Sequence, residues 1–119
     1  MKEKCPVYEV ANLLGKKWSL QILLELCKGK NAWKRYSEIK RKIPKINPRA
    51  FSLRLKGLEK EGLIKKKVSV KSFPIKSKYS LTKSGRDFVK VIDAMKKWTL
   101  KWKKIDKECK KILCEQCKR

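Results

Sequence analysis

The chain has 119 residues, of which 35 are Lys or Arg and 11 are Asp or Glu, so its formal net charge at pH 7 is +24. This length suits one domain, and the charge indicates a polyanionic partner, with nucleic acid first and an anionic membrane surface second. A lysine-rich surface that serves only solubility is the alternative. No apolar run approaches the ~20 residues of a membrane span, and the N-terminus lacks a signal peptide's apolar region. We therefore expect a cytoplasmic protein with no membrane partner.

The composition also argues against an enzyme. The chain has no His, and it shows no paired acidic residues, no glycine-rich phosphate loop and no nucleophile beside a base. The sequence therefore predicts a binding protein without catalytic activity. It predicts no cofactor, apart from the zinc considered below for the tail cysteines.

Two N-terminal segments have the periodicity of helices. Pro6 suits the first turn of a helix that runs to Leu14 and is ended by Gly15. A second helix is expected from about residues 16–18 to Lys28, before Gly29. Its apolar face is formed by Trp18, Ile22, Leu23 and Leu26. Since this face is wide, we expect the second helix at the centre of the domain; residues 31–35 then form a loop or a short strand.

Residues 35–62 predict two short helices joined by a tight turn. Pro44 ends the first helix, because proline and the residue before it both resist helical continuation. Asn47 offers a side-chain oxygen as the cap of a new helix, and Pro48 fits the first helical position. The buried side of the first helix is expected to be Tyr36, Ile39 and Ile43.

The helix that begins at Pro48 has an apolar back and a cationic front. Its apolar residues recur at i, i+4 and i+7 and are Phe51, Leu55 and Leu58. Arg49, Lys56 and Lys60 fall on the opposite side of the wheel, with Ser52 at its edge. Such a helix behind a short supporting helix is typical of a helix-turn-helix, with the second helix lying on DNA.

Two strand-like runs follow at residues 63–71 and 76–81, and residues 72–75 lie between them. We expect a basic β-hairpin that forms a wing along the adjacent minor groove or backbone. Its expected phosphate contacts are Lys71, Lys76 and Lys78. A solvated cap on the helices is the alternative.

The last helix is expected to begin after Thr82 and to carry an apolar residue at every third or fourth position. These residues are Phe88, Val91, Met95, Trp98, Trp102, Ile105, Cys109 and Ile112. The spacing predicts a seam of about three heptads, which is typical of a helix paired along its length. We therefore expect a homodimer that carries two recognition helices to major grooves ~34–36 Å apart. Packing of this face on its own domain is the alternative.

Three segments of the chain are similar to a known protein family. They are CPVYEVANLLGKKWSLQILLEL, RYSEIKRKIPKINPRAFSLRLKGLEKEGLI and KYSLTKSGRDF. They resemble the HxlR-type winged helix-turn-helix transcriptional regulators, relatives of the MarR family, over roughly Cys5 to Trp98. The resemblance implies a mainly α fold with a small β-hairpin (α+β). It also implies Ser52 and Arg54 as motif positions of the recognition helix. Dimer contacts would come from the first and last helices. Together with the apolar spacing of the last helix, this gives Val7, Met95, Trp98, Trp102 and Ile105 as the expected contacts.

Two features depart from the family pattern. Leu53 lies where a polar base contact is usual; it could touch a thymine methyl group but cannot hydrogen-bond a base, which lowers the expected specificity. Beyond Trp98 the chain adds a lysine-rich tail. We therefore divide the chain into a DNA-binding domain at 1–98, which includes the start of the dimerisation helix, and a cysteine-containing extension at 99–119.

The cysteines allow several interpretations. In some relatives the residue at Cys5 is a thiol that senses oxidants, quinones or aldehydes, and a helix N-terminus amid lysines stabilises a thiolate. An unreactive residue at the dimer contact is the alternative for Cys5. Cys27 is expected in the core.

The tail cysteines are Cys109, Cys114 and Cys117. The two-residue gap between Cys114 and Cys117 suits zinc, but a closed site needs a fourth ligand, from Cys5, Glu115 or a partner chain. Redox or disulfide chemistry, zinc binding, and thiols without a role all remain open.

The sequence as a whole favours a homodimeric, sequence-specific regulator bound to double-stranded DNA and acting as a repressor, with a response to thiol oxidation left open. Arg49, Ser52 and Lys56 are the expected contacts to base edges or flanking phosphates, each base contact supplying ~1–3 kcal/mol of discrimination. Arg54 could equally hold the domain together. An architectural protein that coats DNA with little sequence preference is the alternative, which the charge and Leu53 favour.

Overall fold

The computed structural model describes residues 5–69, 71 and 76–103, and its first two helices are α1 (Pro6–Leu14) and α2 (Ser19–Cys27). Gly15 caps α1 as predicted, and its N–H donates to the Ala11 carbonyl at 2.8 Å. The second helix starts slightly later than expected, because Trp18 adopts a left-handed φ of 79° and turns the chain there.

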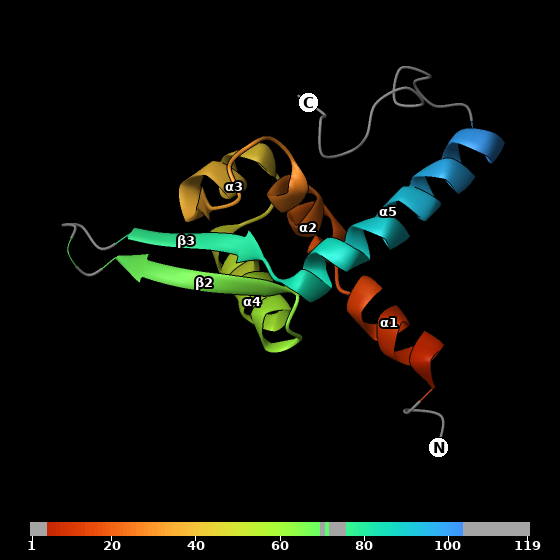
Figure 1. Cartoon of the computed structure of the whole chain (residues 1–119), viewed down its shortest axis with the longest axis horizontal. Coiled ribbons are helices and arrows are strands. Elements are labelled where there is room, and N and C mark those ends of the chain that lie inside the picture. The colour runs from red at the N-terminus through yellow and green to blue at the C-terminus, as the bar shows by residue number, and fades with distance from the viewer. Residues whose placement is uncertain (1–4, 70, 72–75, 104–119) are drawn as a thin grey trace.

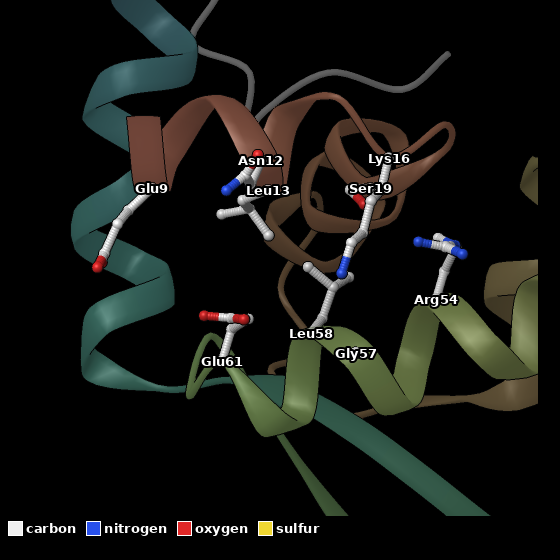
Figure 2. A pocket seen from close by; sticks show the side chains of 9 residues that line it. All are labelled: Glu9, Asn12, Leu13, Lys16, Ser19, Arg54, Gly57, Leu58 and Glu61. Carbon is white, nitrogen blue, oxygen red and sulfur yellow. The ribbon is translucent and has the colours of Figure 1, made fainter. Parts of the chain in front are cut away.

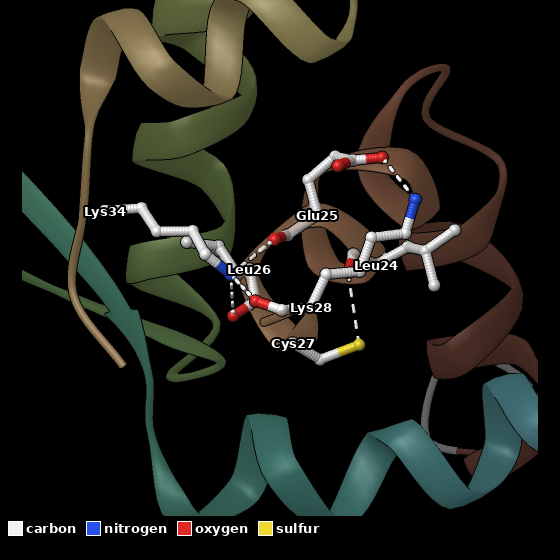
Figure 3. Close-up of polar contacts among 6 residues, drawn as sticks. All are labelled: Leu24, Glu25, Leu26, Cys27, Lys28 and Lys34. Atoms are coloured by element: carbon white, nitrogen blue, oxygen red, sulfur yellow. Dashed lines mark hydrogen bonds and ion pairs between the residues drawn. The ribbon is translucent and has the colours of Figure 1, made fainter. Parts of the chain in front are cut away.

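Strand β1 (Lys34–Arg35) is tied to the end of α2 by one side chain (Figure 3). The Lys34 ammonium donates to the carbonyls of Glu25 at 2.8 Å and Leu26 at 3.0 Å, and also to that of Lys28. These are terminal carbonyls without helical partners, and the negative end of the helix dipole favours a cation there. Burial of the side chain, in turn, lowers the pKa of Lys34. Of the two predictions for residues 31–35, a loop or a short strand, the strand is present at Lys34–Arg35. Its Lys34 side chain fastens the strand to the end of α2.

The predicted helix-turn-helix is present as α3 (Tyr36–Lys42) and α4 (Pro48–Lys60). The Asn47 side chain accepts a hydrogen bond from the Ala50 N–H at 2.8 Å, as the capping pattern predicted. Ile43 and Ile46 are buried in the connecting turn. The turn is therefore anchored in the core, which orients α4 relative to α3.

The sheet is antiparallel, with strand order β1-β3-β2, and consists of β1, β2 (Ile64–Ser69) and β3 (Lys76–Leu81). In β2 and β3, Ile64 lies opposite Leu81 and Lys67 lies opposite Lys78. Figure 1 shows this hairpin projecting on the side opposite to α5. The predicted β-hairpin is confirmed, although residue 70 and the 72–75 connection lie outside the described residues.

One hydrophobic core joins the helices to the inner face of the sheet. Its most deeply buried side chains are Phe51, Ile22, Leu23, Ile39, Ile46, Leu55, Leu58 and Ile64. The predicted stripes of α2, α3 and α4 all contribute to it, so the fold is the mainly helical winged helix expected from the sequence. None of the described helices is both long and apolar enough to cross a bilayer.

Helix α5 (Lys83–Trp102) begins at a crowded junction. The Thr82 hydroxyl accepts from the Gly85 N–H at 3.1 Å and donates to the Gly62 carbonyl at 2.5 Å. A Cβ atom on Gly85 would lie 2.1 Å from the Leu63 carbonyl oxygen, so only glycine fits at this position. The junction joins the start of α5 to the turn that follows α4.

The expected seam of α5 is mostly uncovered in the single chain, because Val91, Trp98 and Trp102 are exposed, while Phe88 and Met95 are partly buried against the core. The buried residues of α5 are Gly85, Val89 and Ile92, which lie beside the seam. The helix ends at Trp102, because Lys103 has extended φ and ψ of −115° and 147°. The prediction of one unbroken helix through Ile112 is therefore wrong at Lys103. The rest of that seam, Ile105, Cys109 and Ile112, lies outside the described residues.

Candidate nucleic-acid interface

The outward face of α4 carries four exposed side chains in one stripe. Arg49, Leu53, Lys56 and Lys60 recur at i, i+4, i+7 and i+11, opposite the buried back of the helix. Leu53 is 52% exposed at the middle of the stripe. The helix therefore presents three cations around one apolar side chain, as the sequence predicted.

Ser52 is held at the edge of this stripe by Tyr36 of α3. The Ser52 and Tyr36 hydroxyl oxygens are 3.2 Å apart, and the Tyr36 hydroxyl donates to the Pro48 carbonyl at 3.4 Å. The Tyr36 ring also packs against Phe51, with centroids 4.7 Å apart. Tyr36 thus adds a second contact between the two helices, besides the buried turn of Ile43 and Ile46. The sequence predicted its burial but gave no signal for this contact, which joins residues 16 positions apart.

Arg54 lies on the flank of α4 that faces α1 and α2, where it lines a cleft of about 280 Å³ (Figure 2). The other lining residues are Glu9, Asn12, Leu13, Lys16, Ser19, Gly57, Leu58 and Glu61. The partly buried Arg54 side chain therefore points away from the exposed stripe. This placement favours the structural alternative for Arg54.

The wing lysines are exposed on the described part of the hairpin. Lys78 lies opposite Lys67, and Lys76 lies opposite Ser69 at the distal end of the ladder. Lys71 follows β2 and is also exposed. All three predicted phosphate contacts are thus accessible to a ligand.

Exposed apolar side chains also lie on α1 and, separately, on α5. Val7 is 67% exposed on α1, whereas Trp98 and Trp102 are 57% and 66% exposed on α5. Met95 instead packs partly against the domain's own core. The predicted contact Ile105 lies outside the described residues.

The described cysteines occupy different environments. Cys5 is the N-cap residue of α1 and is partly exposed. The Cys27 thiol donates to the Leu24 carbonyl at 3.1 Å, and its side chain packs against the core as predicted. The tail thiols Cys109, Cys114 and Cys117 lie outside the described residues. Within residues 5–69, 71 and 76–103, no group of three or more His, Cys, Asp or Glu side chains is placed to hold a metal.

Relatives of known class are similar to this chain over most of its length. The HTH-type transcriptional regulator YdeP of Bacillus subtilis (strain 168) is 42% identical over 106 residues, which cover 88% of this chain and 80% of YdeP. The solved reduced form of the transcriptional regulator YodB from B. subtilis superposes with a TM-score of 0.70 at 34% identity, covering 82% of this chain and 93% of that one.

A second solved structure, the redox regulator HypR in its oxidized form, gives a TM-score of 0.68 at 32% identity, covering 85% of this chain and 100% of that one. The family model described as HxlR-like helix-turn-helix matches residues 13–107. The match contains the capped turn, the cationic stripe of α4 and the wing described above. The chain therefore belongs to the HxlR-like helix-turn-helix family of transcriptional regulators.

Proposed function

We propose that this regulator is a sequence-specific, homodimeric repressor that binds double-stranded DNA in the cytoplasm. The observation that carries the proposal is the exposed stripe of α4, in which Arg49 and Lys56 flank Leu53 on a helix anchored by its buried back. Arg and Lys donate to guanine edges and phosphates, while a leucine contacts a thymine methyl group. Ser52, held by Tyr36, contributes at the edge of the same face.

Dimerisation uses the exposed apolar residues of α1 and α5. Trp98 and Trp102 would leave a large apolar area in water on a monomer, which soluble proteins avoid outside interaction sites. Two paired copies would place their α4 helices in successive major grooves, about 34–36 Å apart, on a roughly palindromic site. Occupation of such a site within a promoter represses transcription by excluding RNA polymerase. In this arrangement residues 1–98 form the DNA-binding domain, which includes the start of the dimerisation helix, and residues 99–119 form a C-terminal extension.

The thiol response is assigned to Cys5. Cys5 caps α1 beside the exposed Val7, so oxidation there would alter a helix that belongs to the proposed dimer surface. The similarity to YodB, solved in its reduced form, and to the redox regulator HypR, solved in its oxidized form, supports this assignment. The three tail cysteines provide a second set of thiols for disulfide formation or zinc.

The test is a binding titration at about 0.15 M salt, where screening suppresses weak long-range attraction. Genomic fragments, including DNA upstream of the protein's own gene, compete against a scrambled duplex. Reduced protein, diamide-treated protein and oxidised protein returned to thiol are compared, with Cys5→Ser as the control variant.

We expect a strong preference for one fragment that is lost on oxidation, regained with thiol, and insensitive to oxidation in Cys5→Ser. A preference that ignores oxidation would remove the thiol response and leave the repressor. No preference for any fragment would overturn sequence specificity in favour of an architectural DNA-coating protein.

A further inference from the structure

The cleft beside Arg54, with a volume of about 280 Å³, is lined by one charged stripe from the α1 segment and one from α4. Glu9 and Lys16 are seven residues apart at the two ends of the first stripe, and Arg54 and Glu61 are seven apart at the ends of the second. Residues seven apart lie on the same side of a helix, two turns from each other. We call this space the α1–α4 cleft.

The two stripes run in opposite directions, so like charges face each other across the cleft. Figure 2 shows Glu9 and Glu61 at one end and Lys16 and Arg54 at the other. None of these four side chains forms an ion pair or a hydrogen bond with another residue of the described ranges. The cleft therefore has an anionic end and a cationic end, and the described part of the chain neutralises neither.

The middle of the α1–α4 cleft combines apolar and hydrogen-bonding groups. Leu13 lines it from α1 and Leu58 from α4, while Asn12 contributes a side-chain amide. Ser19, which is only 2% exposed, adds a hydroxyl to the inner wall. A ligand lying between the charged ends is thus offered hydrogen-bond donors and acceptors as well as an apolar surface, as is usual for small-molecule sites.

Gly57 keeps the α4 side of the cleft open. It lies inside α4, where glycine is less favourable than alanine. A Cβ atom at this position would meet no atom within 4 Å, so packing inside the protein does not require a glycine. A longer side chain would instead extend into the cleft that Gly57 lines. The glycine is therefore explained by a cleft that has to stay open.

We propose that the α1–α4 cleft binds a short peptide with free termini, about three residues long. Its terminal carboxylate lies at Lys16 and Arg54, and its terminal ammonium lies at Glu9 and Glu61. Seven residues of helix rise about 10 Å, which is the reach of about three extended residues. A free α-amino acid is too short, because both of its charges lie on one Cα atom. A peptide also carries amide groups for the polar middle of the cleft.

Such a ligand would join α1 to the helix that contacts DNA. Because α1 carries the exposed Val7 of the proposed dimer surface, a bound peptide would fix α4 relative to that surface and change the affinity for DNA. This consequence rests on the proposed function, whereas the binding site itself does not.

The experiment is isothermal titration calorimetry of the whole chain without DNA. The ligands are Ala-Ala-Ala, its N-acetylated form, its C-terminal amide, free alanine, and 8-aminooctanoate, which has both charges but no amide group. Glu9→Gln with Glu61→Gln removes the anionic end, and Gly57→Leu fills the cleft. The matched control, Glu59→Gln with Asp87→Asn, removes the same charge from exposed positions outside the cleft. Melting temperatures show that each variant is folded.

We expect Ala-Ala-Ala to bind, and the N-acetylated and amidated forms to bind at least about tenfold more weakly, because each loses charge-assisted hydrogen bonds. Free alanine should not bind. The Glu9→Gln, Glu61→Gln protein should bind the free and N-acetylated peptides equally, since the groups that recognise the ammonium are gone. Gly57→Leu should abolish binding without lowering the melting temperature, and the control should bind like the wild type.

Unchanged peptide binding in Gly57→Leu would place the peptide outside the cleft and overturn the site. Equally tight binding of 8-aminooctanoate would overturn the peptide in favour of any extended zwitterion. Absence of binding to the wild type would overturn the proposal but leave the proposed function standing, because no DNA is present. A dissociation constant for the preferred DNA fragment that is the same with and without saturating Ala-Ala-Ala would overturn the link to DNA binding.

Discussion

Helices α4 and α5 are both amphipathic, and each buries one face in the same core. They differ in the face that remains uncovered. On α4 this face is cationic around Arg49 and Lys56, whereas on the second half of α5 it is aromatic, at Trp98 and Trp102. A cationic face attracts phosphates through long-range, salt-sensitive forces, and an aromatic face associates with another apolar surface by excluding water.

In both helices the buried face holds the fold together, while the uncovered face is the one left for a partner. The two helices are also mechanically joined. The carbonyl of Gly62, just after α4, accepts a hydrogen bond from the Thr82 hydroxyl. Gly85 of α5 packs directly on the Leu63 carbonyl. Pairing of two α5 helices would therefore set the positions of two α4 helices.

The largest effect is expected from charging the aromatic face. Trp98→Glu with Trp102→Glu should raise the dimer dissociation constant at least about 100-fold, since central aromatic residues of interfaces contribute about 2 kcal/mol or more each. Sedimentation velocity measures the change. The control Lys90→Gln with Lys97→Gln alters the net charge equally on exposed α5 positions and should remain dimeric. An unchanged sedimentation coefficient for the Trp variant would refute the α5 interface.

The next effect is expected on the cationic face. Arg49→Ala with Lys56→Ala should reduce the preference for the specific fragment at least about 30-fold, because each base contact supplies about 1–3 kcal/mol. The dimer should stay intact, since both side chains are exposed on α4, which lies apart from the second half of α5 (Figure 1). Competition binding measures the ratio, with Lys83→Ala and Lys90→Ala as the charge-matched control. A variant that protects its site normally would show that the contact helix has been misassigned.

A smaller effect, on stability, is expected at the junction between the two helices. Gly85→Ala should destabilise the fold by about 1–3 kcal/mol, because the new methyl group overlaps the Leu63 carbonyl. Gly57→Ala in α4 meets no atom within 4 Å and should stabilise the helix by up to about 1 kcal/mol. Urea unfolding measures both values. Equal urea midpoints for the two variants would mean that the backbone around Gly85 accommodates the methyl group without loss of stability.

Most of α4 could be predicted from the sequence. Asn47, Pro48 and the stripe of Phe51, Leu55 and Leu58 are local signals, because capping and helical periodicity depend on residues within one or two turns. The helical periodicity that predicted this buried stripe also predicted that the cations of α4 face outward. Arg54 could not be assigned, since its direction matters only relative to α1 and α2, which come from a distant part of the chain.

Helix α5 shows the limit of periodicity. The spacing of three and four predicted Phe88, Val91 and Met95 as part of a face for a partner helix, but it did not predict which neighbouring residues pack on the core. The core buries Val89 and Ile92, because the Thr82–Gly85 junction fixes the rotation of the helix about its axis. That rotation depends on contacts with the turn after α4, which no local pattern contains.

The sequence by itself determined the element order, the helix-turn-helix with its cationic face, and the nucleic-acid partner class implied by a charge of +24. These properties depend on composition and on neighbours along the chain. Only the tertiary structure decided the three carbonyls that Lys34 caps, the contact of Tyr36 with Ser52, and the strand register that aligns Arg35, Lys78 and Lys67. The physical reason is that these arrangements join residues distant in sequence, whose relative positions exist only once the core has packed.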